Sequence, residues 1–367
     1  MHKGMNIAFF GSSLVSAYWN GAATYYRGII HALHGRGHRV TFYEPDAYDR
    51  QRHRDIPDPT WAKVVVYPAT EQGVAHALDT ARGADVIVKA SGVGVFDERL
   101  QQAVPDVAHP GAVAVYWDVD APATLQRMRE APEDPLRRAI PQYDLVLTYG
   151  GGEPVIEAYE GFGAASCVPI YNALDPSTHY RVTPDPRFAA DLAFLGNRLP
   201  DRERRVDEFF LEAAAALPGY RFLLGGSGWA DKPVPANVEY CGHVYTADHN
   251  AFNCTPMAVL NISRESMARN GFSPATRVFE AAGAGACLIS DAWEGMDAFL
   301  EPDWEVLLAE DGAAVAELLG SLEPARARAI GERARRRVLR EHTYAHRVQQ
   351  LESVLEGRGR LIGRAVS

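Results

Sequence analysis

The chain has 367 residues, of which 47% are hydrophobic and 23% are charged. This composition is ordinary for a folded globular protein and excludes a disordered or fibrous chain, while the length exceeds what one hydrophobic core usually supports. We therefore expect two domains. The net charge of -10 argues against a general nucleic-acid binder, which would present a basic face to the phosphate backbone. Any phosphate site in this protein must be local.

The N-terminal segment leads directly into an apolar run, and no signal peptide is visible. No apolar run is long enough to span a membrane. The cysteines are scattered, without the paired spacing of a zinc site, and are interpreted as buried thiols in a reducing compartment; they are Cys167, Cys241, Cys254 and Cys287. We expect a cytoplasmic protein.

Short apolar runs alternate with helical patterns along the chain, which is typical of a parallel α/β fold. In the first half these runs are residues 7–10, 40–43, 64–67, 86–88, 113–117, 145–147 and 168–171. In the second half they are residues 192–195, 222–224, 238–240, 258–262, 288–290 and 306–308. The alternation restarts after Pro184-Asp185-Pro186, so we place a hinge near residues 173–188.

Two helical patterns, at 324–341 and 344–356, end the chain. We predict one Rossmann-like domain at residues 1–178, to which a C-terminal helix at about 343–367 returns, and a second at residues 186–342. The economical arrangement is two lobes that face one cleft, with ligands at the carboxyl ends of the strands. The first loop lacks the G-x-G-x-x-G spacing, which disfavours an NAD enzyme.

The most informative segment lies between the runs at 258–262 and 288–290. A glycine loop at Gly271 precedes a helical pattern in which Pro274 suits the first position and Ser273 suits the cap. The amide groups at such a helix start favour an anion, and Arg264 and Arg277 can add charge-assisted bonds to phosphate oxygens.

Glu280, further along the same helical pattern, is an acceptor-only group that suits paired ribose hydroxyls. The alternative is that Arg277 and Glu280, three residues apart, simply pair with each other. Three further loops follow strands of the same half: Gly196-Asn197-Arg198, Gly225-Gly226-Ser227-Gly228 and Gly242-His243-Val244. We predict that these loops and the glycine loop form one binding site, made of Gly196, Asn197, Arg198, Gly226, Ser227, His243, Val244, Arg264, Asn270, Gly271, Phe272, Ser273, Thr276, Arg277 and Glu280.

These motifs resemble the donor-binding region of GT-B fold glycosyltransferases, most closely the bacterial CgeB-like branch of group 1. The resemblance extends over most of the chain, through 194–198, 225–229, 20–22 and 117–122. It implies a glycosyltransferase of the hexosyltransferase type in glycan biosynthesis, with a UDP or dTDP sugar as co-substrate and no other cofactor. It also implies that residues 186–342 bind the donor through Glu280, and that residues 1–178 face the acceptor.

One departure concerns the donor sugar. Better-known group-1 enzymes carry a second glutamate eight positions before the ribose glutamate, and this position is Phe272 here. The nearest polar candidate is Asn270. The resemblance therefore leaves open the sugar and the choice between retention and inversion.

The first half supplies candidates for the acceptor side and for catalysis. The sequence Asp118-Val119-Asp120 follows a strand, so either carboxylate can orient an acceptor hydroxyl or act as a base, with His109 as a helper. A D-x-D metal site is the disfavoured alternative, because hard cations need several converging oxygens. The acceptor-side candidates are Ser12, Ser13, Asn20, Gly21, Gly151 and Gly152.

The expected reaction transfers a sugar from a nucleoside diphosphate without a metal, with Arg198, Arg264 and Arg277 stabilising the charge on the leaving group. A nucleotide-sugar epimerase or isomerase, or a non-catalytic nucleotide-sugar-binding protein, remain as alternatives. The acceptor can be a glycan, a lipid-linked molecule or a small molecule. The arginines of residues 324–341 permit peripheral membrane contact, although such a charged helix face is usually only solvated. Neither a nucleic-acid partner nor a transmembrane segment is expected.

Overall fold

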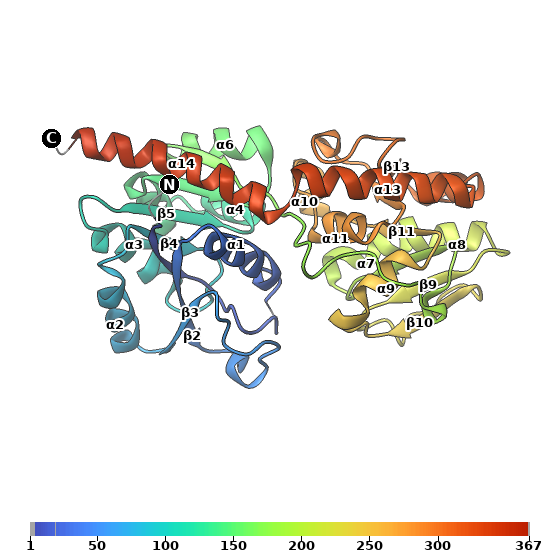
Figure 1. The fold of residues 1–367 in the computed structure, drawn as a ribbon, viewed down its shortest axis with the longest axis horizontal. Coiled ribbons are helices and arrows are strands. Elements are labelled where there is room, and N and C mark those ends of the chain that lie inside the picture. The colour runs from blue at the N-terminus through green and yellow to red at the C-terminus, as the bar shows by residue number, and fades with distance from the viewer. Residues whose placement is uncertain (1–3, 19, 366–367) are drawn as a thin grey trace. The chain divides into compact units, whose positions relative to one another are not determined.

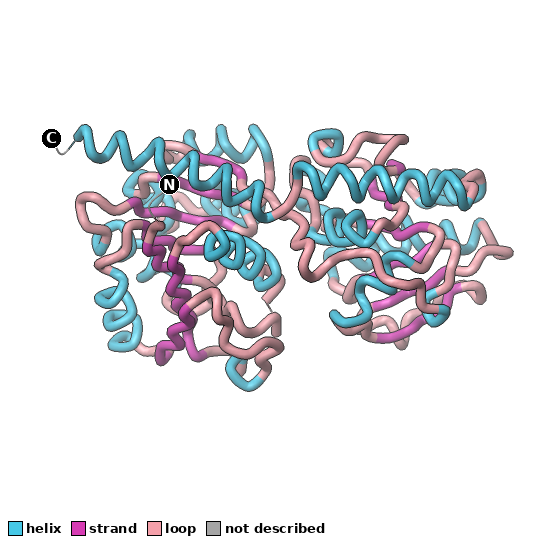
Figure 2. The backbone as a smooth tube through the Cα atoms, in the orientation of Figure 1, coloured by secondary structure: helices cyan, strands magenta, loops and turns pink. Residues whose placement is uncertain are grey.

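A computed structural model describes residues 4–18 and 20–365. The chain divides into two compact units (Figures 1 and 2). Unit 1 consists of Met1–Tyr171 and Tyr344–Ser367, and unit 2 of Asn172–Thr343. Each unit is a parallel sheet accompanied by helices.

In the described part of unit 1, seven strands form a sheet of order β3-β2-β1-β4-β5-β6-β7, with every pair parallel. β1 lies between β2 and β4, and Ile7 pairs with Val40 on one side and Val86 on the other. Their buried Val, Ile and Phe side chains explain why these runs form central strands. The strands are β1 Asn6–Phe10, β2 Arg39–Asp46, β3 Lys63–Pro68, β4 Val86–Ala90, β5 Val113–Asp118, β6 Leu145–Thr148 and β7 Cys167–Pro169.

Helices connect these strands, and the last helix of the chain returns to them. α14 (Tyr344–Ala365) packs against α1 (Ala23–Gly35), where Gly28 leaves room for the ring of Tyr344. Glu352 accepts hydrogen bonds from Arg36 (2.7 Å) and binds His38 (2.9 Å), which fixes α14 to the edge of unit 1. The other helices are α2 Glu71–Ala81, α3 Asp97–Val107, α4 Ala121–Glu130, α5 Pro135–Ala139 and α6 Gly152–Gly161, with short 3-10 turns η1 Arg50–Arg52 and η2 Ile140–Gln142.

In the described part of unit 2, six parallel strands have the order β10-β9-β8-β11-β12-β13. Leu260 of β11 pairs with Phe194 of β8 and with Ile289 of β12, and all three side chains are buried. The strands are β8 Leu192–Leu195, β9 Phe222–Gly225, β10 Val238–Gly242, β11 Ala258–Asn261, β12 Leu288–Asp291 and β13 Leu307–Ala309.

The helices of unit 2 include a continuous run of α7 (Pro200–Val206), a π turn η4 (Asp207–Leu211) and α8 (Glu212–Ala216). The expected helix at 324–341 is present as α13 (Pro324–Glu341). Several of its arginines meet neighbouring acids or rings; for example, Arg333 lies 3.7 Å from the ring centre of Trp304. The remaining elements are α9 His249–Cys254, α10 Glu265–Asn270, α11 Thr276–Ala284 and α12 Gly312–Gly320, with η3 Pro186–Phe188, η5 Thr246–Asp248 and η6 Met296–Ala298.

Both sheets have a point where the strand order reverses. In unit 1 it lies between β1 and β4, and in unit 2 between β8 and β11. Parallel α/β sheets bind ligands at such switch points, outside the carboxyl ends of the strands. All four cysteines are free thiols, and Cys167 and Cys287 are buried. None of the described helices has the length and apolar character needed to cross a membrane.

Candidate active site

The loop after β8 lies at the switch point of unit 2. Asn197 accepts a hydrogen bond from the backbone N–H of Ser227 (3.0 Å), and Trp229 donates its indole N–H to the carbonyl of Gly196 (2.7 Å). Gly226 has a φ of +117°, and a Cβ at this position would lie 2.2 Å from the Gly196 carbonyl oxygen. The predicted residues Gly196, Asn197, Gly226 and Ser227 are therefore brought together, and only glycine fits at 226.

Arg198 does not point into an open anion site. Its guanidinium donates to Glu203 (2.8 Å) and to Asp231 (2.9 Å), and these hydrogen bonds raise the pKa of Arg198. The same bonds, with Lys232, lower the pKa of Glu203 to about 2. The prediction that Arg198 receives a phosphate is corrected accordingly, because two neighbouring carboxylates already neutralise its charge.

Arg202, rather than Arg198, is the arginine that lies between the loop after β8 and Arg277. It lies in the first turn of α7, where its guanidinium donates to the carbonyl of Asn197 (3.4 Å) and would be 3.1 Å from a Cβ at Gly196. Its charge also lowers the pKa of Arg277. Sequence reasoning passed over Arg202 because it stands within a run of charged helix residues, and its electrostatic effect on Arg277 distinguishes it from them.

Arg277 is the most unusual cation of this region. It lies near the start of α11 and is half-buried, yet no described residue forms a hydrogen bond or an ion pair with its guanidinium. Burial lowers the pKa of Arg277 to about 10, with a further contribution from Arg202 and an opposing one from Glu280. A cation held in this way is suited to an incoming anion.

The alternative interpretation, an ion pair between Arg277 and Glu280, is not found. Glu280 instead lies 3.6 Å from Nε2 of His179, whose other ring nitrogen is 2.9 Å from the hydroxyl of Thr178. Close packing makes this contact feasible, since a Cβ on Gly283 of α11 would clash with Leu174 and lie 3.1 Å from the His179 carbonyl. On α11, the carboxylate of Glu280 therefore contacts His179, while the guanidinium of Arg277 forms no ion pair with it.

The start of α11 differs from the prediction. The helix begins at Thr276 and its cap position is Ala275, without a side-chain cap, so Pro274 and Ser273 belong to the preceding extended segment. Asn172 explains this shift, because its amide donates to the carbonyl of Pro274 (3.2 Å) and accepts from the hydroxyl of Thr276 (3.3 Å). These bonds hold the segment before the helix in place.

The glycine loop before α11 is strained. Gly271 has a φ of +66° and Phe272 a φ of +44°. A non-glycine residue in this region costs on the order of 1–2 kcal/mol. The backbone N–H of Phe272 donates to the Glu294 carbonyl (2.6 Å), and Asn270 donates to the Ser266 carbonyl (2.6 Å). Asn270 is thus engaged within its own helix, α10.

A buried network fixes the ends of β11 and β12. Asp291 accepts hydrogen bonds from Arg205 (2.6 Å) and from the backbone N–H of Ser263 (3.1 Å), and burial raises the pKa of Asp291. Arg205 also donates to the Ser263 carbonyl (3.0 Å). Arg264, half-buried, follows directly at the cap position of α10. The network therefore positions the segment that carries Arg264.

The loop after β10 carries the last predicted donor residues. His243 is exposed and stands edge-on to the ring of Tyr245, with ring centres 4.7 Å apart. Val244 is buried, and its carbonyl lies 3.3 Å from Nε2 of His249. Burial lowers the pKa of His249, and Glu280 opposes this effect. The loop after β10 is thereby linked to the surroundings of Glu280.

Asp118, a candidate catalytic residue, is a structural carboxylate. It is fully buried at the end of β5, where it accepts hydrogen bonds from the Tyr159 hydroxyl, the Thr124 hydroxyl (3.1 Å) and the backbone N–H of Asp120 (3.0 Å). All three donors belong to unit 1, and they join β5, α4 and α6 through this carboxylate. These bonds favour a structural role for Asp118, and its role as a base stays a prediction.

The structure separates His109 from the two aspartates. His109 is exposed and precedes β5, whereas Asp118 and Asp120 lie at its carboxyl end, so a strand length of roughly 17 Å stands between them. His109 accepts a hydrogen bond from the Gly111 N–H (3.1 Å) and shapes the turn before the strand. Asp120, half-buried at the cap position of α4, lies with Asp118 at the carboxyl end of β5, where ligands bind.

The side chains of the acceptor-side candidates after β1 are engaged within their loop. Ser12 donates to Asn20 (2.8 Å), Ser13 donates to Glu44 (3.1 Å), and the Asn20 amide donates to the carbonyls of Ser13 and Ser16. Gly21 is exposed with open space around it, as expected for a simple turn residue.

Gly151 and Gly152 turn the chain after β6 with φ values of +105° and +54°. A Cβ at Gly151 would lie 2.1 Å from Val155, so the sharp entry into α6 requires glycine. Among the described residues no group of three or more His, Cys, Asp or Glu side chains is arranged to hold a metal ion.

A known family model matches part of the chain. Residues 202–353 match the model described as "Glycosyl transferase-like". No curated protein sequence matches the chain. The match lies mainly in unit 2, which contains the switch-point residues described above.

Solved glycosyltransferases share the fold of the whole chain. Anabaena HepE, solved with UDP and glucose, has 15% identity and a TM-score of 0.66, and the match covers 96% of this chain and 100% of HepE. An α-glucosyltransferase solved with UDP-glucose and DNA containing an abasic site has 12% identity, a TM-score of 0.71 and the same coverage of 96% and 100%. AviGT4, a glycosyltransferase of avilamycin A biosynthesis, has 18% identity, a TM-score of 0.60 and 98% coverage of each chain. These likenesses confirm the predicted GT-B fold.

Proposed function

We propose that the protein is a glycosyltransferase that moves a sugar from a nucleoside-diphosphate sugar to an acceptor. One observation carries the proposal: the guanidinium of Arg277, half-buried near the start of α11, has no acidic partner because the carboxylate of Glu280 lies against His179. The likeness to structures solved with UDP or UDP-glucose supports a uridine diphosphate sugar as the donor. The hexosyltransferase type and a role in glycan biosynthesis are parts of the same proposal.

The diphosphate would lie between the loop after β8 and the start of α11. Arg202 and Arg277 are close enough to repel each other, and a diphosphate between them would offset that repulsion. Backbone amides at the start of α11 add a partial positive charge. As the bond to the sugar breaks, negative charge grows on the leaving diphosphate, and fixed cations stabilise this charge most in the transition state. We propose that protein cations do this without a metal ion.

The nucleoside would extend from the diphosphate toward Glu280 and the loop after β10. Glu280 has carboxylate oxygens that can accept hydrogen bonds from two ribose hydroxyls. The same carboxylate lies 3.6 Å from Nε2 of His179. Backbone groups around Val244 are suited to the base, because His249 holds the Val244 carbonyl. In this way one helix, α11, would bind a neutral diol with one side chain and an anion with another.

The acceptor and the base that activates it are assigned to unit 1. Asp118 is buried and accepts three hydrogen bonds, and His109 lies at the opposite end of β5, so Asp120 is the candidate that we favour. We propose that Asp120 orients the acceptor hydroxyl. Its replacement by Asn should reduce transfer to an acceptor and leave UDP affinity unchanged.

One assay tests the proposed function. The purified protein is incubated with a panel of nucleotide sugars, with and without cell-extract acceptors and with and without EDTA, and release of nucleoside diphosphate is followed. Release that depends on acceptor and survives EDTA supports the proposal. Conversion of the donor without an acceptor would indicate an epimerase or isomerase, and binding without release would indicate a non-catalytic module.

A further inference from the structure

The switch point of unit 1 holds a buried arginine without a carboxylate partner. Arg50 is 6% exposed and lies in η1, directly after β2. One terminal nitrogen donates to the carbonyl of Ser12 after β1 (3.2 Å) and to the carbonyl of Val93 after β4 (3.4 Å). Because β1 and β4 flank the switch point, Arg50 spans the place where this kind of sheet binds its ligand.

Much of the hydrogen-bonding capacity of Arg50 is unused. Its Nε is buried without a hydrogen-bond partner, and its second terminal nitrogen also has none among the described residues. Glu44 acts on Arg50 electrostatically, but its carboxylate accepts hydrogen bonds from the Ser13 hydroxyl (3.1 Å), the Leu14 N–H (2.7 Å) and the Gln51 amide (2.5 Å). A buried charge without a partner is unfavourable, and an anionic ligand would remove this cost.

Other donors beside Arg50 also lack acceptors. The Tyr26 hydroxyl is buried beside Ser12 and Arg50 and forms no hydrogen bond of regular geometry; burial raises its pKa, and the nearby Ser12 hydroxyl lowers it in part. The backbone N–H groups of Ser12 and Ser13 have no acceptor among residues 4–18 and 20–365, although both residues are buried. Buried donors of a native structure normally have partners.

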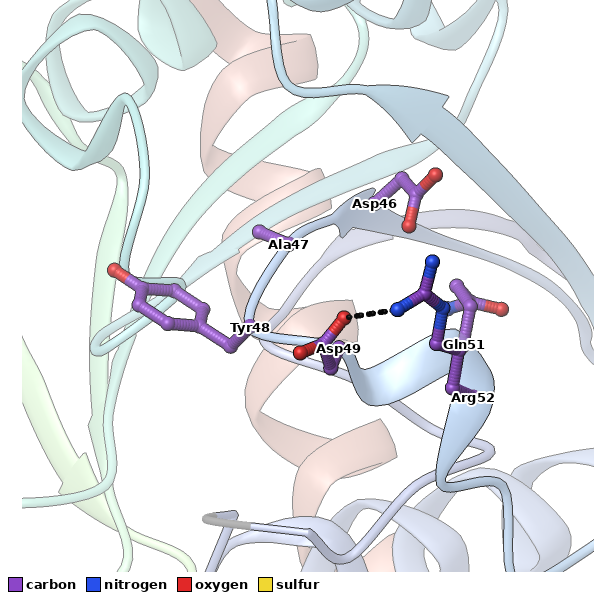
Figure 3. A pocket seen from close by; sticks show the side chains of 6 residues that line it. All are labelled: Asp46, Ala47, Tyr48, Asp49, Gln51 and Arg52. Carbon is purple, nitrogen blue, oxygen red and sulfur yellow. Dashed lines mark ion pairs between the residues drawn. The ribbon is translucent and has the colours of Figure 1, made fainter.

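Backbone strain places Arg50 in this position. Tyr48 and Asp49 have φ values of +57° and +55°, and two consecutive residues of this kind cost on the order of 2–4 kcal/mol. Figure 3 shows this turn: Asp49 pairs with Arg52 (3.5 Å), and the ring of Tyr48 points away from that pair. Tyr48 donates to the Gly94 carbonyl (2.7 Å), and its ring centre lies 4.9 Å from the guanidinium carbon of Arg50. Such strain is kept where the surroundings enforce it, often at binding sites.

We propose that Arg50, the Tyr26 hydroxyl and the backbone amides of Ser12 and Ser13 form an anion-binding site in unit 1. The ligand is a phosphate or carboxylate group of a small molecule. If the proposed function holds, on which this part of the inference rests, the group belongs to the acceptor, which is then an anionic molecule. The binding site itself does not depend on that function.

Calorimetric titrations with inorganic phosphate and with acetate test the site. They use the full chain carrying Arg277→Met, so that the donor-side cation of unit 2 does not contribute. We expect Arg50→Met to weaken binding at least about tenfold, because it removes charge-assisted hydrogen bonds. Binding of phosphate alone assigns a phosphate ligand, and binding of acetate assigns a carboxylate; either result supports the site.

Tyr26→Phe provides a second variant in case Arg50→Met fails to fold. It removes a hydroxyl that forms no hydrogen bond of regular geometry within the protein, so the fold should persist while anion affinity falls roughly threefold or more. Tyr67→Phe is the matched control, because the Tyr67 hydroxyl is also buried without a partner but lies on β3, away from the switch point. The inference is overturned if neither anion binds, or if Tyr26→Phe and Tyr67→Phe have the same effect. UDP binding by the protein with Arg277 intact is measured separately and decides the proposed function.

Discussion

Replacement of Arg277 by Met separates binding from folding more sharply than any other substitution. A hydrogen bond to a charged group contributes about 1.5–3 kcal/mol, so loss of the guanidinium should weaken UDP binding roughly 10- to 150-fold. Uridine lacks the diphosphate, and its affinity should not change. Calorimetric titration with both ligands measures the difference.

The same substitution should not destabilise the protein. Burial lowers the pKa of Arg277 to about 10, a change that corresponds to about 3 kcal/mol of unfavourable free energy for the charged form in the folded state. Because no described residue pairs with this guanidinium, a neutral side chain removes the cost and keeps much of the packing. The midpoint of urea unfolding should therefore stay the same or rise.

Arg205→Met is the matched control for this experiment. Arg205 is paired with the buried Asp291, so its removal leaves a carboxylate without its cation and should cost about 3–5 kcal/mol of stability. If Arg277→Met lowers stability as Arg205→Met does, Arg277 is a structural residue. Unchanged UDP affinity in Arg277→Met would refute its role directly.

Three further predictions concern neighbouring groups. His179→Gln should allow Glu280 to reach Arg277 and weaken UDP binding roughly fivefold, as expected for an ion pair of about 1 kcal/mol; calorimetry should show no further loss when the change is added to Glu280→Gln. Asp118→Asn should lower the free energy of unfolding by about 2–4 kcal/mol in urea titrations, since three donors bind this buried carboxylate; normal stability with lost turnover would instead restore its catalytic role. Burial lowers the pKa of His249, so below about pH 6.5 the unfolded chain binds a proton at this residue more readily than the folded chain does. The free energy of unfolding therefore decreases as the pH is lowered. Melting curves between pH 7 and 5 should show a smaller loss for His249→Asn, and an equal loss would contradict this assignment.

The sequence predicted the fold well because the fold depends on repeated local patterns. Buried strands such as β1 and β11 are short apolar runs between turn residues, and this local pattern can be recognised in the sequence alone. The helix at Pro324–Glu341 was likewise marked by proline at its start and by its alanine and arginine content. The start of α11 was less certain, because it depends on hydrogen bonds from Asn172, which is distant in sequence.

The site was predicted less completely because side-chain partners come from other elements. Arg198 and Arg202 look alike in the sequence, and only the positions of Glu203 and Asp231 show which arginine is neutralised. In the same way, the spacing of Arg277 and Glu280 permits an ion pair, whereas the structure brings Glu280 to His179, which is distant in sequence. His109 was predicted to help Asp118 because the two residues are close in sequence. They lie at opposite ends of β5, so the strand separates them.

A crystal structure with bound UDP would show whether the switch point of unit 2 binds the diphosphate of a nucleotide sugar. We expect phosphate oxygens within hydrogen-bonding distance of Arg277 and of the backbone at the start of α11, with the ribose against Glu280. A diphosphate bound elsewhere, with Arg277 still without an anionic partner, would contradict this expectation.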